Sequence, residues 1–77
     1  MNKTRRKELE KAIDLLGQAQ EIVDCCAEEE RDAYDNLSEG VQESERGMQM
    51  EENADNLEDA SSNLQDVINQ IQEVVDA

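Results

Sequence analysis

The 77-residue sequence contains no histidine, proline, tryptophan or phenylalanine, and it has only one tyrosine and three glycines. Without histidine, its serines and cysteines lack the usual general base that would activate them as nucleophiles. Histidine is also a required ligand of di-iron helical bundles and a frequent ligand of zinc. We therefore expect no enzyme activity, no catalytic residues, no cofactor and no metal site.

Long hydrophobic runs are also missing. No apolar stretch approaches the roughly 20 residues that a membrane-spanning helix needs, and no signal-peptide core follows the basic start. The two cysteines, Cys25 and Cys26, are adjacent. Neighbours on a helix point about 100° apart, so they cannot join two parts of the fold as a disulfide. We expect a soluble protein of a reducing cytoplasm, without membrane contact.

The residues that are present favour helices. Glu, Gln, Ala, Leu and Asp are abundant, and strand-forming residues are scarce. Apolar and small side chains recur at alternating spacings of three and four, which is typical of a helix that packs along one seam. In the first half these seam residues are Leu9, Ala12, Leu16, Ala19, Val23, Cys26, Ala33 and Leu37, and in the second half Met50, Ala54, Leu57, Ser61, Leu64, Ile68, Ile71 and Val75.

This pattern predicts one all-α domain over residues 1-77, an antiparallel, coiled-coil-like hairpin of two helices. The first helix is expected at about 3-35, the turn at about 36-44 and the second helix at about 45-76. Matching the two seams places Ser61 opposite Ala19. In the turn, Asn36 and Gly40 can adopt left-handed conformations, and Ser38 or Ser44 can cap the second helix.

Further apolar side chains flank the seam. They are Ile13, Leu15, Ile22, Tyr34, Val67 and Val74. A lone hairpin would leave this stripe in water, and burying each side chain is worth roughly 1.5 to 3 kcal/mol. We therefore expect a homodimer in which two hairpins pair into a four-helix bundle, and a different protein docked on the stripe is the alternative.

The formal net charge is -14, yet five of the seven basic residues lie in the first eleven positions. The rest of the chain is strongly acidic and repels phosphate. Direct nucleic-acid binding is therefore unfavourable except through the basic arm from Lys3 to Lys11. Its carboxylates can instead imitate nucleic acid toward a basic protein. The candidate contacts are Glu51, Glu52, Asp55, Glu58 and Asp59. The alternative is that the acids only keep the protein soluble.

The segment AYDNLSEGVQESERGMQMEENADNLEDA, from Ala33 to Ala60, resembles a group of small acidic helical proteins of bacteriophages and mobile elements. In that group an aromatic-Asp-Asn-Leu turn is followed by Ser-Glu-Arg-Gly and an acidic helix. The upstream RRKELEKAIDLL is similar too, whereas Ser38 stands where the group's turn has proline. The resemblance implies a helical hairpin in the host bacterial cytoplasm, and no particular chemistry.

Two hypotheses of function follow. The first is a non-catalytic inhibitor that occupies the basic nucleic-acid-binding surface of a host protein, as in anti-defence proteins of phages. The second is a structural or adaptor homodimer that docks a partner through the apolar stripe.

Overall fold

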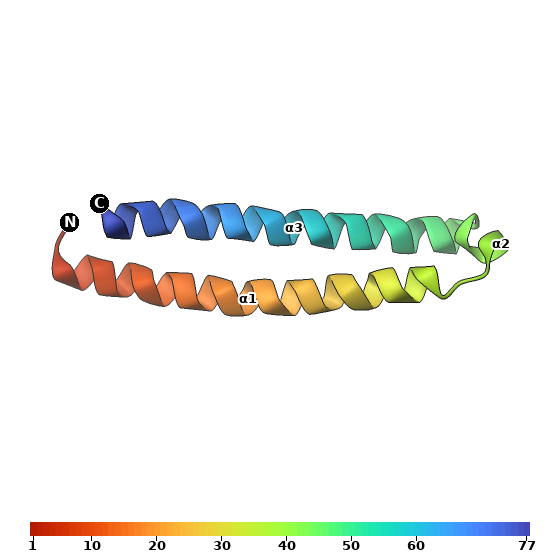
Figure 1. Ribbon diagram of the computed structural model, residues 1–77, viewed down its shortest axis with the longest axis horizontal. Helices are drawn as coiled ribbons and strands as arrows, with labels where there is room; N and C mark the ends of the chain where they lie inside the picture. The colour runs from red at the N-terminus through yellow and green to blue at the C-terminus, as the bar shows by residue number, and fades with distance from the viewer.

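A computed structural model describes all residues from Met1 to Ala77 and shows two long helices folded back on each other (Figure 1). Helix α1 covers Lys3–Asp35, the short helix α2 covers Glu39–Gln42 and helix α3 covers Glu45–Asp76. The hairpin measures 58 × 15 × 13 Å. No strand is present, so the predicted all-α hairpin is confirmed, and no helix is both long enough and apolar enough to cross a membrane.

The N-terminal end of α1 is stabilised by a cap and by the end of α3. The side chain of Asn2 accepts a hydrogen bond from the backbone N–H of Arg5 at 2.8 Å. Basic residues in a first helical turn oppose the helix dipole. The Arg6 guanidinium offsets part of this cost, because it donates to the backbone carbonyl of Ala77 at 3.1 Å, beside the negative end of the α3 dipole.

The turn at the other end contains α2, which the sequence did not indicate. No residue of the chain has a positive φ, so the prediction of left-handed conformations at Asn36 and Gly40 was wrong. The chain reverses instead through the short α2 helix between two extended cap residues, Ser38 and Ser44. The expected cap at Ser44 is confirmed, since its hydroxyl accepts a hydrogen bond from the backbone N–H of Gly47 at 3.3 Å.

Helix α2 packs directly against the first turn of α3 at Gly47. A Cβ atom at Gly47 would collide with the backbone carbonyl oxygens of Val41 and Gln42 and would lie 2.6 Å from the carbonyl carbon of Gln42. The side-chain amide of Gln42 also donates to the backbone carbonyl of Tyr34 at 3.0 Å. These contacts hold α2 against the ends of both long helices at the turn.

The seam of α3 is as predicted. Ala54, Ser61 and Val75 are buried, and Met50, Leu57, Leu64, Ile68 and Ile71 are half-buried. The seam of α1 was predicted wrongly at several positions. Ala19, Cys26 and Ala33 are exposed, and the residues that follow them, Gln20, Ala27 and Tyr34, take their places.

Polar bonds explain why Gln20 is tolerated in the seam. Its amide donates to the backbone carbonyl of Ser61 at 3.3 Å, and the Ser61 hydroxyl donates to the Asp24 carboxylate. Ser61 therefore lies between Gln20 and Asp24, about three residues along α1 from the expected position opposite Ala19. This shift in register decides which charged residues of the two helices meet.

Candidate functional site

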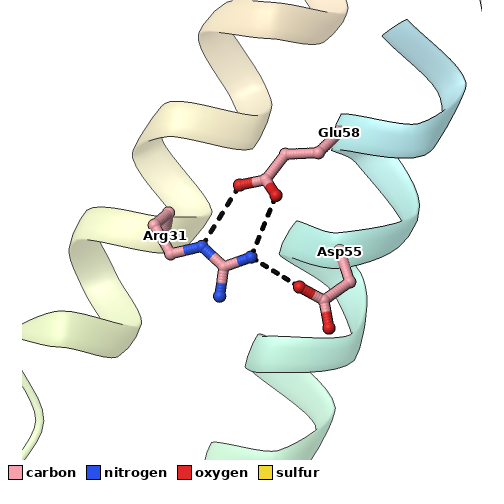
Figure 2. A network of polar contacts seen from close by, with 3 residues as sticks. All are labelled: Arg31, Asp55 and Glu58. Atoms are coloured by element: carbon pink, nitrogen blue, oxygen red, sulfur yellow. Dashed lines mark hydrogen bonds and ion pairs between the residues drawn. The ribbon is translucent and has the colours of Figure 1, made fainter. Parts of the chain in front are cut away.

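One arginine links the two long helices through two carboxylates (Figure 2). Nη2 of Arg31 lies 2.6 Å from Oδ1 of Asp55 and 3.1 Å from Oε2 of Glu58, and Nε of Arg31 lies 3.2 Å from Oε1 of Glu58. The contact with Glu58 is therefore bidentate, the strongest geometry of an arginine–carboxylate pair. Hydrogen bonds to Glu58 and then to Asp55 raise the pKa of Arg31 further above its ordinary value.

The Arg31 cluster shows how the sides of the hairpin are arranged. Arg31 follows the seam residue Ala27 by four positions, and Glu58 follows the seam residue Ala54 by four. Residues seven apart share a face of a helix, so Asp24 and Glu51 lie on the same side as this pair. We call this side the acidic flank, and its carboxylates are Asp14, Glu21, Asp24, Glu28, Glu51, Asp55 and Glu58.

All five predicted acidic contacts are exposed, but they are not equivalent. Asp55 and Glu58 are occupied by Arg31. Glu51 lies beside Tyr34, and its carboxylate raises the pKa of the Tyr34 hydroxyl. Glu52 and Asp59 make no hydrogen bond and no ion pair with any other side chain. The pairing of Arg31 was missed at the sequence level because it depends on the register of the two helices.

Glu52 and Asp59 belong to a longer row on the outer face of α3. Acidic residues recur there at every seventh position, which places them on one line along the helix. We call this row the acidic ridge, and it consists of Glu45, Glu52, Asp59, Asp66 and Glu73. Each member is exposed, and successive members are about 10.5 Å apart at 1.5 Å per residue. The seven-residue spacing is visible in the sequence, although the prediction named only two of these positions.

The opposite side of the hairpin carries no charge over much of its length. It lies on the side of the residues that precede the seam residues by one position, where α3 also carries the uncharged amides Asn53, Asn56, Asn63 and Gln70 and the start of α1 carries Glu8. We call this side the apolar flank, and it comprises Ala12, Leu15, Ala19, Ile22 and Cys26 of α1 with Ala60, Val67 and Val74 of α3. Leu15 and Ile22 are 64% and 66% exposed, which is unusual for such large apolar side chains.

Four of the six residues of the predicted apolar stripe are exposed in the structure, and two are half-buried. Leu15, Ile22, Val67 and Val74 are exposed and belong to the apolar flank. Ile13 and Tyr34 are half-buried and lie in the seam, because the true seam positions follow the predicted alanines by one residue. These two residues are therefore less accessible than the other four, and the role of the stripe in dimer or partner contact stays a prediction.

A shallow groove of about 560 Å³ lies beside the turn. Its lining combines the apolar surfaces of Tyr34 and Met48 with Gln42 and the carboxylates of Glu43, Glu51, Glu52 and Asp55. No group of three or more histidine, cysteine or acidic residues is arranged to hold a metal ion. The groove presents only negative charge around an apolar floor.

Tyr34 reports on this groove because it is the only tyrosine of the chain. The hydrogen bond to Glu51, followed by burial and by the charges of Glu51 and Asp35, raises the pKa of the Tyr34 hydroxyl. We expect Glu51→Ala to lower this pKa in an ultraviolet absorbance titration, whereas Glu52→Ala leaves it nearly unchanged. Equal shifts in the two variants would contradict the placement of Glu51 beside Tyr34.

Because the pKa of Tyr34 is raised in the folded hairpin, the free energy of unfolding depends on pH where tyrosine titrates. The folded hairpin binds the Tyr34 proton more tightly than the unfolded chain does. The contribution to stability is therefore fully present below the ordinary tyrosine pKa of about 10, and it is lost as the pH rises through the folded value.

Both cysteines are exposed thiols. The charge of the Glu29 carboxylate is the main cause that raises the pKa of Cys25, and burial and a hydrogen bond to Glu29 add to it. The Sγ atom of Cys25 lies 3.8 Å from Oε1 of Glu29. A raised pKa disfavours the thiolate, so Cys25 is a poor nucleophile near neutral pH.

Comparisons of the chain with protein-family profiles, with curated protein sequences and with solved structures found no significant match.

Proposed function

We propose that this protein is a non-catalytic interaction protein whose acidic ridge binds a basic, nucleic-acid-binding surface of another protein. The observation that supports the proposal is the separation of the side chains, with carboxylates on the outer face of α3 and on one flank and none on the apolar flank. All five positions of the outer row of α3 are acidic, so the row presents negative charge that no basic residue interrupts.

The rigidity of the ridge adds to this argument. Its five members lie on one 32-residue helix, so their spacing is set by the helix and costs no ordering entropy on binding. A regular row of exposed negative charge is the feature that a groove built to bind phosphates would recognise. The ridge would thus act as an inhibitor that competes with nucleic acid, which is the anti-defence role considered for proteins of phages and mobile elements.

We further propose that the working form is a pair of hairpins in a four-helix bundle. The apolar flank would be buried between the two copies, as in other bundles made from helical hairpins. Pairing in this way leaves the ridges of both copies on the outside, because the ridge lies on the outer face of α3. The bundle would then be bivalent, which increases binding to a partner with repeated sites.

The proposed function is tested by comparing two variants that have the same total charge and differ in whether the ridge is changed. A ridge variant carries Glu52→Gln, Asp59→Asn, Asp66→Asn and Glu73→Gln. A matched control carries Glu10→Gln, Asp14→Asn, Glu21→Gln and Asp32→Asn, which are exposed acids of α1 outside the ridge. Each variant lacks four of the 21 acidic residues and has the same net charge.

The measurement is retention of nucleic-acid-binding proteins from a bacterial extract on the immobilised chain, followed by elution with duplex DNA. We expect the original chain and the α1 control to retain proteins that DNA elutes, and the ridge variant to retain few or none. Equal retention by the two variants would show that net charge alone causes the binding, and it would refute the ridge as the contact surface.

The adaptor hypothesis remains the second candidate, because Leu15 and Ile22 are the most exposed large apolar side chains. It assigns the apolar flank to a helix of a different protein, with the acids serving solubility. Binding of that kind would persist in high salt and in the ridge variant, since burial of apolar surface is not screened.

A further inference from the structure

We infer that two copies of the chain pair through their apolar flanks with their turns at opposite ends, so that the basic start of each α1 lies beside the acidic turn end of the other copy. This arrangement deepens the four-helix bundle proposed above and rests on it. Two independent observations carry it, the symmetry of the apolar flank and the distribution of charge between the ends of the hairpin.

The apolar flank is complementary to itself when one hairpin is reversed. On α1 its members run from Ala12 to Cys26, which are seven positions before and after Ala19, and Leu15 and Ile22 lie four positions before and three after it. Reversing a second copy about this point brings Leu15 of one α1 against Ile22 of the other, and Ala19 lies near its own counterpart. Small residues near the centre allow two helices to approach closely.

Helix α3 gives nearly the same centre. Its apolar members Ala60, Val67 and Val74 are evenly spaced about Val67. Because Ser61 lies between Gln20 and Asp24, Val67, six residues further along α3, is level with about residue 16 of α1, which is about 4.5 Å from the level of Ala19. One twofold axis near the middle of the hairpin therefore relates both helices to their counterparts, and α1 packs on α1 while α3 packs on α3.

Charge decides between this arrangement and one with both turns at the same end. The first eleven residues carry five basic and two acidic side chains, whereas residues 28-52 around the turn carry two basic and ten acidic. With turns at the same end, the two acidic regions would be adjacent and would repel. With turns at opposite ends, each basic start meets acidic residues of the other copy, among them Glu29 and Asp32.

The occupant of the flank is thus a second copy rather than an unrelated helix. A partner of different sequence would need an apolar face of matching length and also a charge gradient of opposite direction. The chain itself supplies both, because the basic start of α1 and the acidic turn lie at opposite ends of the hairpin (Figure 1).

The first arm of the test is the mass of the full chain in solution, measured by light scattering under reducing conditions. We expect twice the chain mass of 8.7 kDa for the original protein and for Gln18→Glu, and the single-chain mass for Ile22→Glu. Gln18 is exposed on the same helix but outside the apolar flank, so both variants add one negative charge. Far-ultraviolet circular dichroism checks that the exposed Ile22 can be changed without loss of helix.

The second arm is zero-length cross-linking of lysine to carboxylate with a carbodiimide. The only lysines are Lys3, Lys7 and Lys11. Lys11 is eighteen positions before Glu29 on the same helix, about 27 Å at 1.5 Å per residue, so a link to Glu29 or Asp32 can form only between two copies. We expect such links in the original protein and their loss in Ile22→Glu.

Each outcome separates the claims. A dimer whose lysines link only to nearby acids or to Glu73 and Asp76 overturns the opposite arrangement of the turns and leaves pairing intact. A single-chain mass overturns both the arrangement and the four-helix bundle. Neither result bears on the acidic ridge, whose binding is measured with the variants described above.

Discussion

Replacing Gly47 with alanine is expected to lower the free energy of unfolding by about 1 to 3 kcal/mol, the usual cost of forcing an additional group into a packed site. The added Cβ would collide with the backbone carbonyl oxygens of Val41 and Gln42. Backbone atoms cannot rotate away as a flexible side chain can, so α2 would have to move off the first turn of α3. Such a movement would also disturb the hydrogen bond from Gln42 to the backbone of Tyr34.

The other two glycines provide controls with the opposite expected sign. No heavy atom lies within 4 Å of a Cβ added at Gly17 or Gly40. Gly17 lies inside α1, where alanine favours the helix by roughly 0.5 to 1 kcal/mol relative to glycine. Urea unfolding followed by circular dichroism would measure all three variants at one protein concentration, because pairing of the hairpins makes stability depend on concentration.

A Gly47→Ala variant as stable as Gly17→Ala would contradict the close packing of α2 on α3. The contrast is informative because helix propensity predicts a gain at both helical positions, and only the close approach of α2 reverses it at Gly47.

The α3 seam could be predicted from the sequence because its heptad positions hold only apolar or small residues. In α1 the same reasoning failed where two adjacent residues competed for one position. Ala19 is apolar and Gln20 is polar, so the apolar pattern favoured Ala19. The structure places Gln20 in the seam because its amide and the Asp24 carboxylate satisfy Ser61, a pairing across the helices that a single-helix pattern does not contain.

For the same reason, the exposed apolar residues could be predicted from the sequence and the Arg31 cluster could not. The exposure of Leu15, Ile22, Val67 and Val74 follows from their distance from the seam, and the sequence indicated it. The neutralisation of Asp55 and Glu58 by Arg31 depends on a register that is set by the bonds at Ser61. A stricter reading of the seven-residue spacing through Ile13, Gln20, Ala27 and Tyr34 would have given the correct face of α1.

Replacing Arg31 with methionine is expected to lower the melting temperature by several degrees, because it removes every ion pair that joins α1 to α3. Methionine keeps much of the length of the side chain but cannot bind the carboxylates. Asp55 and Glu58 would then face the other acids of the acidic flank without compensation, which adds repulsion to the loss of the hydrogen bonds. Thermal unfolding followed by circular dichroism measures the change.

Arg46→Met is the matched control, because it removes the same charge from an exposed arginine that makes no ion pair. If net charge alone governed stability, the two variants would lose the same number of degrees, and that result would refute a structural role of the Arg31 cluster. If the cluster acts through its geometry, the difference between the variants should shrink in about 1 M salt, where the screening length falls to about 3 Å. Partial persistence of the difference at that salt concentration is expected, since the contact with Asp55 is short at 2.6 Å, the contact with Glu58 is bidentate, and the Arg31 side chain is only 29% exposed.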